Sequence, residues 1–272
     1  IAHLDDEDWV ILSNNRAEIR DAAGRLVNRQ VYETKSWYNV PGKDGHPHYM
    51  LKEIYEQPQV IGDTLHSFLN PADRTFTLPD LGFELDAVRS ITIAACGTSY
   101  NAGLIAKYWL EQVSRVRVEV DFASEFRYRG ALMPKDGLAL FISQSGETAD
   151  TLGALRYAKS NGQKILSIVN VAESTIARES DAVLRTYAGP EIGVASTKAF
   201  TTQLTVLAVL TIQLARARGA ITHEQEAKLV GALTEMPSRV AEVLNHDVRL
   251  RELAMELKDA PDVLFLGRGT SY

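Results

Sequence analysis

One pattern occurs twice in this chain and constrains its fold more than any other: an apolar run, a short turn rich in hydroxyl side chains, and a segment with helical periodicity. In the first copy, the apolar run 91–95 leads through the turn 96–99 into a helical segment, 100–112. In the second, the run 138–142 leads through a similar turn into a helical segment, 149–160. Buried strands joined by helices are typical of a parallel sheet. The pattern therefore predicts an α/β fold with both turns at the same, carboxyl edge of its sheet.

The second turn has the composition of an anion-binding site. Ser143, Ser145 and Thr148 supply hydroxyl donors, and Gly146 lets the backbone approach a ligand. The unpaired N–H groups of the next helical turn carry the positive end of the helix dipole, which attracts an anion. The turn has no GK[ST] sequence, so it lacks a P-loop lysine. We predict that it holds a phosphate as a handle. The alternative is a capped helix start, in which the hydroxyls only satisfy backbone donors.

Further apolar runs complete the predicted sheet. Strands are expected over 116–122, 164–169 and 182–186, with helices between them. The fold predicted is a parallel sheet of about five strands, covered by helices on both faces. Thr98 and Ser99 of the first turn should then converge with the hydroxyls of the second on one anion.

A third loop, 191–198, lies between the fifth predicted strand and a long apolar helix. Gly193 would let its backbone pass close to a ligand, and Ser196 or Thr197 would cap the helix. Lys198 is expected to be solvated or ion-paired, because an imine-forming lysine needs a desolvated pocket. Cys96 is expected to be a small buried residue, with a place lining the ligand site as the alternative.

Composition narrows the classes of partner. The net charge of −6 argues against nucleic acid. No apolar run approaches the length of a membrane span, so no membrane contact is predicted. With Cys96 as the single cysteine an intrachain disulfide is impossible, which suits a cytoplasmic protein. The six histidines show no metal-ligand spacing, and neither a metal nor a cofactor is predicted.

The ends of the chain suggest further domains. Three short strands, over 8–13, 17–21 and 26–32, cannot bury enough surface to stand alone and are most simply the tail of a missing β-rich domain. At the other end, the apolar run 263–266 leads into Gly-Thr-Ser-Tyr, as 91–95 leads into the same four residues. This repeat predicts the start of a second, truncated α/β unit.

Four longer motifs resemble a known family. They are ACGTSYN at 95–101, ASEFRYR at 123–129, SQSGETADTL at 143–152 and EIGVASTKAFTTQ at 191–203. In this order they resemble the glucosamine-6-phosphate synthases, the glutamine:fructose-6-phosphate amidotransferases. Residues 49–58 resemble the connector between domains of that family, so the resemblance extends over essentially the whole chain.

The resemblance implies an architecture of one glutaminase domain followed by two sugar-isomerase (SIS) domains. It implies that residues 1–38 end the glutaminase domain and that 39–70 form the connector. Residues 71–220 would be the first SIS domain, 221–258 a helical bridge, and 259–272 the start of the second SIS domain.

The resemblance also implies a binding site and a reaction. The phosphoryl group of a sugar phosphate would be held by Ser99, Ser143, Gln144, Ser145 and Thr148, and the sugar would contact Thr98, Val194 and Ser196. The catalytic residues of the family would lie outside this chain. The implied enzyme makes glucosamine 6-phosphate from fructose 6-phosphate and glutamine, which the missing glutaminase domain would use, and works as a homodimer.

Two alternatives from other classes stay open. A SIS-domain sensor would bind a sugar phosphate to regulate transcription or another enzyme, but the short-stranded, acidic N-terminal segment has no helix-turn-helix pattern. A deglycase would act on fructosamine phosphates, but the glutaminase-like tail before the connector argues against it.

Overall fold

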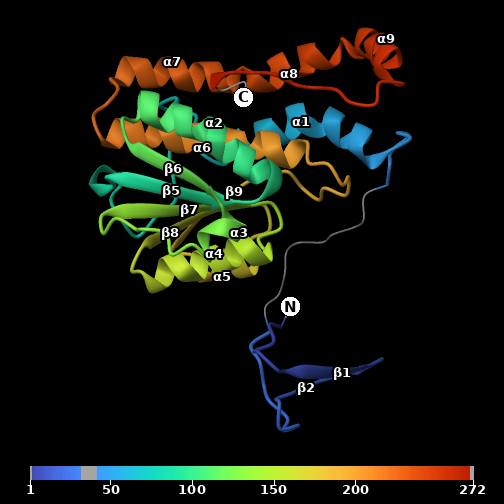
Figure 1. The fold of residues 1–272 in the computed structure, drawn as a ribbon, viewed down its shortest axis with the longest axis vertical. Coiled ribbons are helices and arrows are strands. Elements are labelled where there is room, and N and C mark those ends of the chain that lie inside the picture. The colour runs from blue at the N-terminus through green and yellow to red at the C-terminus, as the bar shows by residue number, and fades with distance from the viewer. Residues whose placement is uncertain (1, 32–41, 270–272) are drawn as a thin grey trace. The chain divides into compact units, whose positions relative to one another are not determined.

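The protein is described from a computed structural model, in which residues 2–31 and 42–269 are placed. The chain divides into two compact units, Ile1–Gly42 and Lys43–Tyr272. Figure 1 shows the sheet and helices of the second unit.

The first unit is built around one antiparallel hairpin. Strands β1 (Trp9–Ser13) and β2 (Arg16–Arg20) pair along their whole length. The predicted third strand does not form in the described residues 26–31, where the structure has only two isolated bridges, Arg20–Leu26 and Ala2–Val31. The reason lies in the turn that precedes these residues. The Asp21 carboxylate accepts hydrogen bonds from the backbone N–H groups of Ala23 and Arg25 and from the Arg25 side chain, and these bonds fix the turn. Tyr32, the last residue of that prediction, lies outside the described residues.

The second unit contains a five-stranded parallel sheet, which confirms the predicted fold class. Its order is β6-β5-β7-β8-β9, and every neighbouring pair is parallel. Alternate residues of each strand face opposite sides, as the two-residue period of a strand requires. The strands are β5 (Ser90–Ala95), β6 (Arg117–Phe122), β7 (Gly137–Ser143), β8 (Lys164–Val169) and β9 (Ala182–Arg185).

Each face of the sheet packs against a separate apolar core. On β7, Leu138, Leu140 and Ile142 point into one core, whereas Ala139 and Phe141 point into the other. The first core packs against α1 (Tyr49–His66), α2 (Gly97–Val113) and α6 (Lys198–Ala217), and the second against α3 (Ala123–Phe126), α4 (Ala149–Ser160) and α5 (Thr175–Glu179) (Figure 1).

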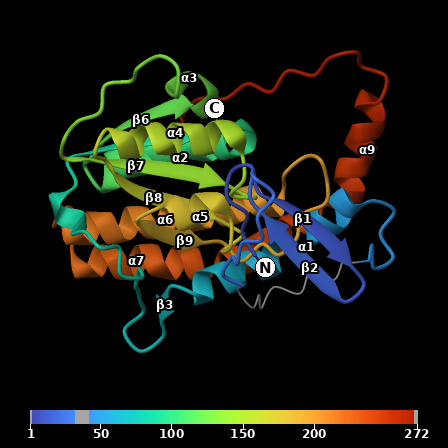
Figure 2. The same cartoon turned by 90° about the horizontal axis from the view of Figure 1, so that it is seen from below.

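A further helical layer lies beyond α1 and α6. It confirms the helical prediction over 222–258 and comprises α7 (His223–Thr234), α8 (Met236–Leu244) and α9 (Asp247–Leu257). Helices α6 and α7 lie side by side in both views (Figure 2). An unpredicted two-stranded pair, β3 (Leu69–Asn70) with β4 (Thr75–Phe76), and a short 3-10 helix, Leu85–Ala87, precede β5.

Helix α1 continues ten residues beyond its predicted end at Glu56. Its interior contains Pro58, which has no N–H to donate to the carbonyl four residues earlier. That carbonyl belongs to Ile54, and it accepts a hydrogen bond of 3.0 Å from the Gln57 side chain instead. The helix therefore survives its proline because a neighbouring side chain replaces the lost backbone donor.

Helix α6 is long and apolar enough, by length and composition, to cross a membrane, contrary to the prediction that no run approaches that length. Of the most apolar 18-residue stretch of this helix, 72% is buried inside the unit. Helices α1, α2 and α7 pack against it. Its apolar character is therefore accounted for by its place in the core.

The predicted strand near the end of the chain does not form. Residues 263–268 have no regular structure, and the side chains of Leu264, Phe265 and Leu266 are almost fully exposed. No strand in the described residues lies alongside them to complete a ladder. The repeated Thr-Ser-Tyr at 270–272 lies outside the described residues, so the start of a second unit stays a prediction.

Candidate functional site

The two hydroxyl-rich turns lie next to each other at the carboxyl edge of the sheet. They follow β5 and β7, which are neighbours with Ala95 opposite Ile142. From β5 the chain crosses to β6 on one side, and from β7 it crosses to β8 on the other. The point between β5 and β7 is therefore the topological switch point of the sheet, where open α/β folds bind their ligands.

The turn after β7 is organised by its own hydroxyl groups. Ser143 Oγ accepts a 3.0 Å hydrogen bond from Gly146 N and lies 3.0 Å from Thr148 Oγ1. Ser145 Oγ accepts one of 3.2 Å from Glu147 N. These bonds curl the backbone of the turn and leave its hydroxyls with further hydrogen-bonding capacity.

Among the described helices of the unit only α5 and α7 have an N-cap side chain that caps the helix; α2 and α4 at the switch point lack one, as do α1, α3, α6, α8 and α9. The N-cap residues of α5 and α7, Ser174 and Thr222, both accept a hydrogen bond from the helix with their side chains. The N-cap residues of α2 and α4, Cys96 and Thr148, make no such bond. Simple helix capping therefore does not account for the hydroxyl at Thr148. The first N–H groups of both helices remain available to an anion.

The segment 170–176 supports the turn after β7 through hydrogen bonds. Asn170 N donates to Gln144 O at 3.2 Å, Ile176 N donates to Gly146 O at 3.0 Å, and Thr175 N donates to the Glu147 carboxylate at 2.7 Å. Residues of this segment were not predicted as part of the site, because no motif in the sequence marks them.

Gly146 is required by this brace and not only by the turn. Its φ of +66° lies in the left-handed region, and a Cβ at this position would lie 1.9 Å from Ser174 Oγ. The backbone of the turn therefore approaches Ser174 as closely as a glycine permits.

The turn after β5 is shorter than predicted, because α2 already begins at Gly97. Ser99 is buried, and its Oγ accepts a hydrogen bond of 3.0 Å from Gln203 Nε2 of α6. Its own O–H remains free to donate to a ligand. Thr98 is exposed at the same helix start. Cys96, expected to be buried, is partly exposed and lies 3.9 Å from Thr151 Oγ1 of α4.

The loop before α6 is held by an acidic residue that was not predicted to act there. Glu191 Oε1 accepts from Thr197 N at 2.9 Å and from Ala199 N at 3.1 Å, and Oε2 accepts from Ser196 Oγ at 3.0 Å. The prediction that Ser196 or Thr197 caps α6 is wrong, since a carboxylate makes the stronger cap at the positive end of a helix. Thr197 Oγ1 is buried and has no hydrogen-bond partner among the described residues. Val194 is fully exposed.

One ion pair joins α1 to α6, and a second residue of α1, Lys52, is paired nearby. Lys198 is buried and its Nζ lies 2.5 Å from Glu56 Oε2, which confirms the expected ion pair. Lys52 is paired with Asp44 at 2.6 Å and with Glu56 at 3.5 Å. The hydrogen bond to Asp44, together with the nearby charge of Glu56, raises the pKa of Lys52 above its usual value.

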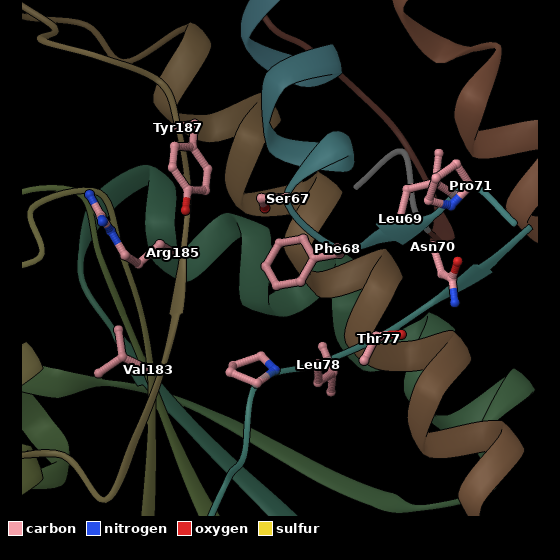
Figure 3. A pocket seen from close by; sticks show the side chains of 11 residues that line it. Ser67, Phe68, Leu69, Asn70, Pro71, Thr77, Leu78, Val183, Arg185 and Tyr187 are labelled. Carbon is pink, nitrogen blue, oxygen red and sulfur yellow. The ribbon is translucent and has the colours of Figure 1, made fainter.

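A cavity of about 620 Å³ lies elsewhere in this unit, between the β3–β4 pair and the edge strand β9. Figure 3 shows Phe68 and Leu78 on its wall, with Arg185 beside Tyr187. The Arg185 guanidinium lies 5.2 Å from the centre of the Tyr187 ring. None of the predicted site residues lines this cavity, so its size alone does not make it the site.

Comparison with known proteins first defines the class. The SIS domain family matches residues 84–213, the part of the chain that contains the sheet and the three loops. Residues 84–213 therefore match the SIS domain class in sequence, and the parallel sheet lies within them.

Two relatives match this chain over its full length. The chain is 50% identical over its full length to the isomerizing glutamine–fructose-6-phosphate aminotransferase of Bradyrhizobium diazoefficiens, and 47% identical to that of Zymomonas mobilis. It spans 45% of the length of each. These matches confirm the resemblance drawn from the motifs.

Two solved structures are also similar to this chain. The C-terminal domain of glucosamine-fructose-6-phosphate aminotransferase from Francisella tularensis is 44% identical, with a TM-score of 0.81, over 85% of this chain and 65% of that one. Glucosamine-6-phosphate deaminase from Thermotoga maritima is 25% identical with a TM-score of 0.53, over 69% of this chain and 54% of that one.

Proposed function

We propose that this chain is the sugar-phosphate-binding part of a glutamine–fructose-6-phosphate aminotransferase, an enzyme that makes glucosamine 6-phosphate. The observation that carries the proposal is that two helix starts with hydroxyl side chains, those of α2 and α4, lie next to each other at the switch point of the sheet. A phosphate fits such a place because the N–H groups and hydroxyls are all donors.

In this proposal the phosphoryl group and the sugar are bound by different loops. The phosphoryl group lies between α2 and α4. The hydroxyl and carbonyl oxygens of the sugar reach the exposed Thr98 and the loop before α6. The donors to the phosphoryl group are Ser99, Ser143, Gln144, Ser145 and Thr148, and the contacts to the sugar are Thr98, Val194 and Ser196.

The chemistry supported is positioning rather than proton transfer. The resemblance assigns no catalytic residue to this chain, and its role is to hold fructose 6-phosphate by its phosphate while ammonia adds at the ketose carbonyl. Glutamine would supply the ammonia through a glutaminase domain whose end is residues 1–38. The single cysteine suits a cytoplasmic enzyme.

Titration of the chain with fructose 6-phosphate, followed by NMR, tests the proposal. We expect saturable shifts for amides of the turn 143–148 and of the start of α2. A sugar-phosphate-dependent affinity for DNA would favour a regulator instead, and release of sugar from fructosamine 6-phosphate would favour a deglycase. Absence of any fructose 6-phosphate binding at millimolar concentration would reject the site.

Ser145→Ala and Thr148→Ala should each weaken fructose 6-phosphate binding by about 1–3 kcal/mol, because each removes a hydrogen bond to a charged group. Affinity for unphosphorylated fructose should hardly change. Ser160→Ala is the matched control, since the Ser160 hydroxyl donates to Tyr157 O at the far end of α4. Equal losses for both ligands would show that the two hydroxyls maintain the fold rather than bind phosphate.

We also propose a homodimer, as the family resemblance implies. Helix α6 is mostly buried in its own unit, so its apolar character is no evidence for an interface. Support comes instead from exposed apolar side chains after β6, including Tyr128 and Leu132. Sedimentation should show a dimer at tens of micromolar, shifted towards monomer by Leu132→Glu. A single monomeric species of the unsubstituted chain would contradict the proposal.

A further inference from the structure

Helix α1 carries a buried carboxylate that no step of the proposed binding uses. Glu53 is 2% exposed. Its Oε1 accepts hydrogen bonds from Ile192 N at 2.6 Å and from Gly193 N at 3.1 Å, and Oε2 lies 3.1 Å from Gly193 N. A buried charge is costly unless it is fully hydrogen-bonded, and here the donors are main-chain groups of one short loop.

Gly193 is shaped to this contact. A Cβ on Gly193 would lie 2.6 Å from Glu53 Oε2 and 3.3 Å from Met50 Cα. The sequence predicted that Gly193 lets the backbone pass close to a ligand. In the structure, the close approach is to α1, and the residue that gains from it is Glu53.

The loop is therefore fixed at both ends by carboxylates. Glu53 holds Ile192 and Gly193, and Glu191 holds Ser196 and the start of α6. Between these attachments lie Val194 and Ala195, both exposed. Two anchors of this kind fix the backbone on either side of the middle of the loop.

The phosphate turn has a separate support. Its brace is the segment 170–176, through Asn170, Ile176 and Thr175. Glu53 makes none of the contacts described for that turn. Loosening the α1 contact should therefore disturb the loop of Val194 and Ser196 and leave the phosphate turn in place.

We propose that Glu53 is a positioning residue that determines affinity for the sugar part of the ligand. It acts through the backbone of residues 192–193, which carries Val194 and Ser196 to the sugar of a phosphosugar. This inference rests on the proposed function, because it takes the two loops to bind the two parts of one ligand.

Glu53→Gln tests the inference with the smallest change of shape. NMR titrations of the chain would measure its affinity for fructose 6-phosphate and for inorganic phosphate. We expect the first to weaken about tenfold, as loss of one charge-assisted hydrogen bond would give, and the second to change less than about twofold. Hydrogen exchange should become faster in residues 191–197. Asp63→Asn is the matched control, because it removes an exposed carboxylate from the same helix and should change none of these readouts.

A second variant guards against misfolding of the first. Gly193→Ala leaves Glu53 intact and separates it from the loop by the added methyl group, so the same selective loss is expected. Equal weakening for fructose 6-phosphate and inorganic phosphate, or no weakening in either variant, would overturn the inference while leaving the proposed function standing. If the unsubstituted chain binds inorganic phosphate but not fructose 6-phosphate, the proposed function fails and the inference with it.

Discussion

Replacing Gly146 with alanine is expected to lower the free energy of unfolding by about 2–5 kcal/mol and to abolish phosphate binding. About 1–2 kcal/mol comes from placing a Cβ at a φ of +66°. The remainder comes from overpacking, about 1–3 kcal/mol, because the new methyl group would lie 1.9 Å from Ser174 Oγ and 2.4 Å from Ser174 Cβ. Since the Ser174 Cβ is itself too close, rotation of the serine cannot relieve the clash. Urea denaturation followed by circular dichroism measures the change.

Gly162→Ala separates the two causes. Gly162 has a φ of +74°, but a Cβ there would meet nothing within 4 Å, so only the backbone cost should appear. The double variant Gly146→Ala, Ser174→Gly should recover part of the steric cost and none of the backbone cost. If Gly146→Ala and Gly162→Ala destabilise the chain equally, the contact with Ser174 has no energetic weight.

Replacing Asn170 with alanine is expected to destabilise the protein by about 2–4 kcal/mol, because it leaves several buried polar groups without partners. Asn170 Oδ1 accepts from Ala188 N at 2.9 Å and from Thr186 Oγ1 at 3.1 Å, and Nδ2 donates to Gly189 O at 2.8 Å. These bonds tie the end of β8 to the chain that follows β9. Asn170 N also holds Gln144 of the phosphate turn.

Thr186→Val is the graded comparison, since it removes only the hydrogen bond from Thr186 Oγ1 to Asn170 Oδ1 and leaves the contacts with Ala188 N and Gly189 O in place. Its cost should be about half that of Asn170→Ala or less. Asn101→Ala, at an exposed position of α2, is the neutral control. Thermal and urea unfolding of all three variants would measure the series. If Asn170→Ala destabilises the protein no more than Asn101→Ala does, the hydrogen bonds of Asn170 do not contribute to stability.

The sheet and its switch point were predictable because local patterns determine them. The strand β8 and the helix α4 have the bounds predicted from apolar period and turn residues alone. The hydroxyl turn after β7 was also found, because Ser143, Ser145 and Thr148 stand together in the sequence. Strand order in a parallel sheet then brings the turn after β5 beside it.

The supports of the site were not predictable, because they are single contacts between distant segments. Glu53 and Ile192 are separated by 139 residues in the sequence. Nothing in the sequence of α1 distinguishes Glu53 from the other glutamates of that helix. Glu191 looked like part of a loop, and the capping role was assigned to adjacent hydroxyls, which are common N-caps. After the Asp21 turn, the predicted third strand of the first unit makes only two isolated bridges in the described residues 26–31.

The contact between α1 and the loop before α6 also has a consequence for the order of folding. Closing it joins the beginning of the second unit to a point beyond its last strand, so every strand of the sheet lies within the closed segment. The entropy lost in such a closure is compensated only when the intervening layers have already packed. The loop that carries Val194 and Ser196 is therefore expected to acquire its shape late, so a nascent or partly unfolded chain would present the turn after β7 before the loop proposed to contact the sugar has formed.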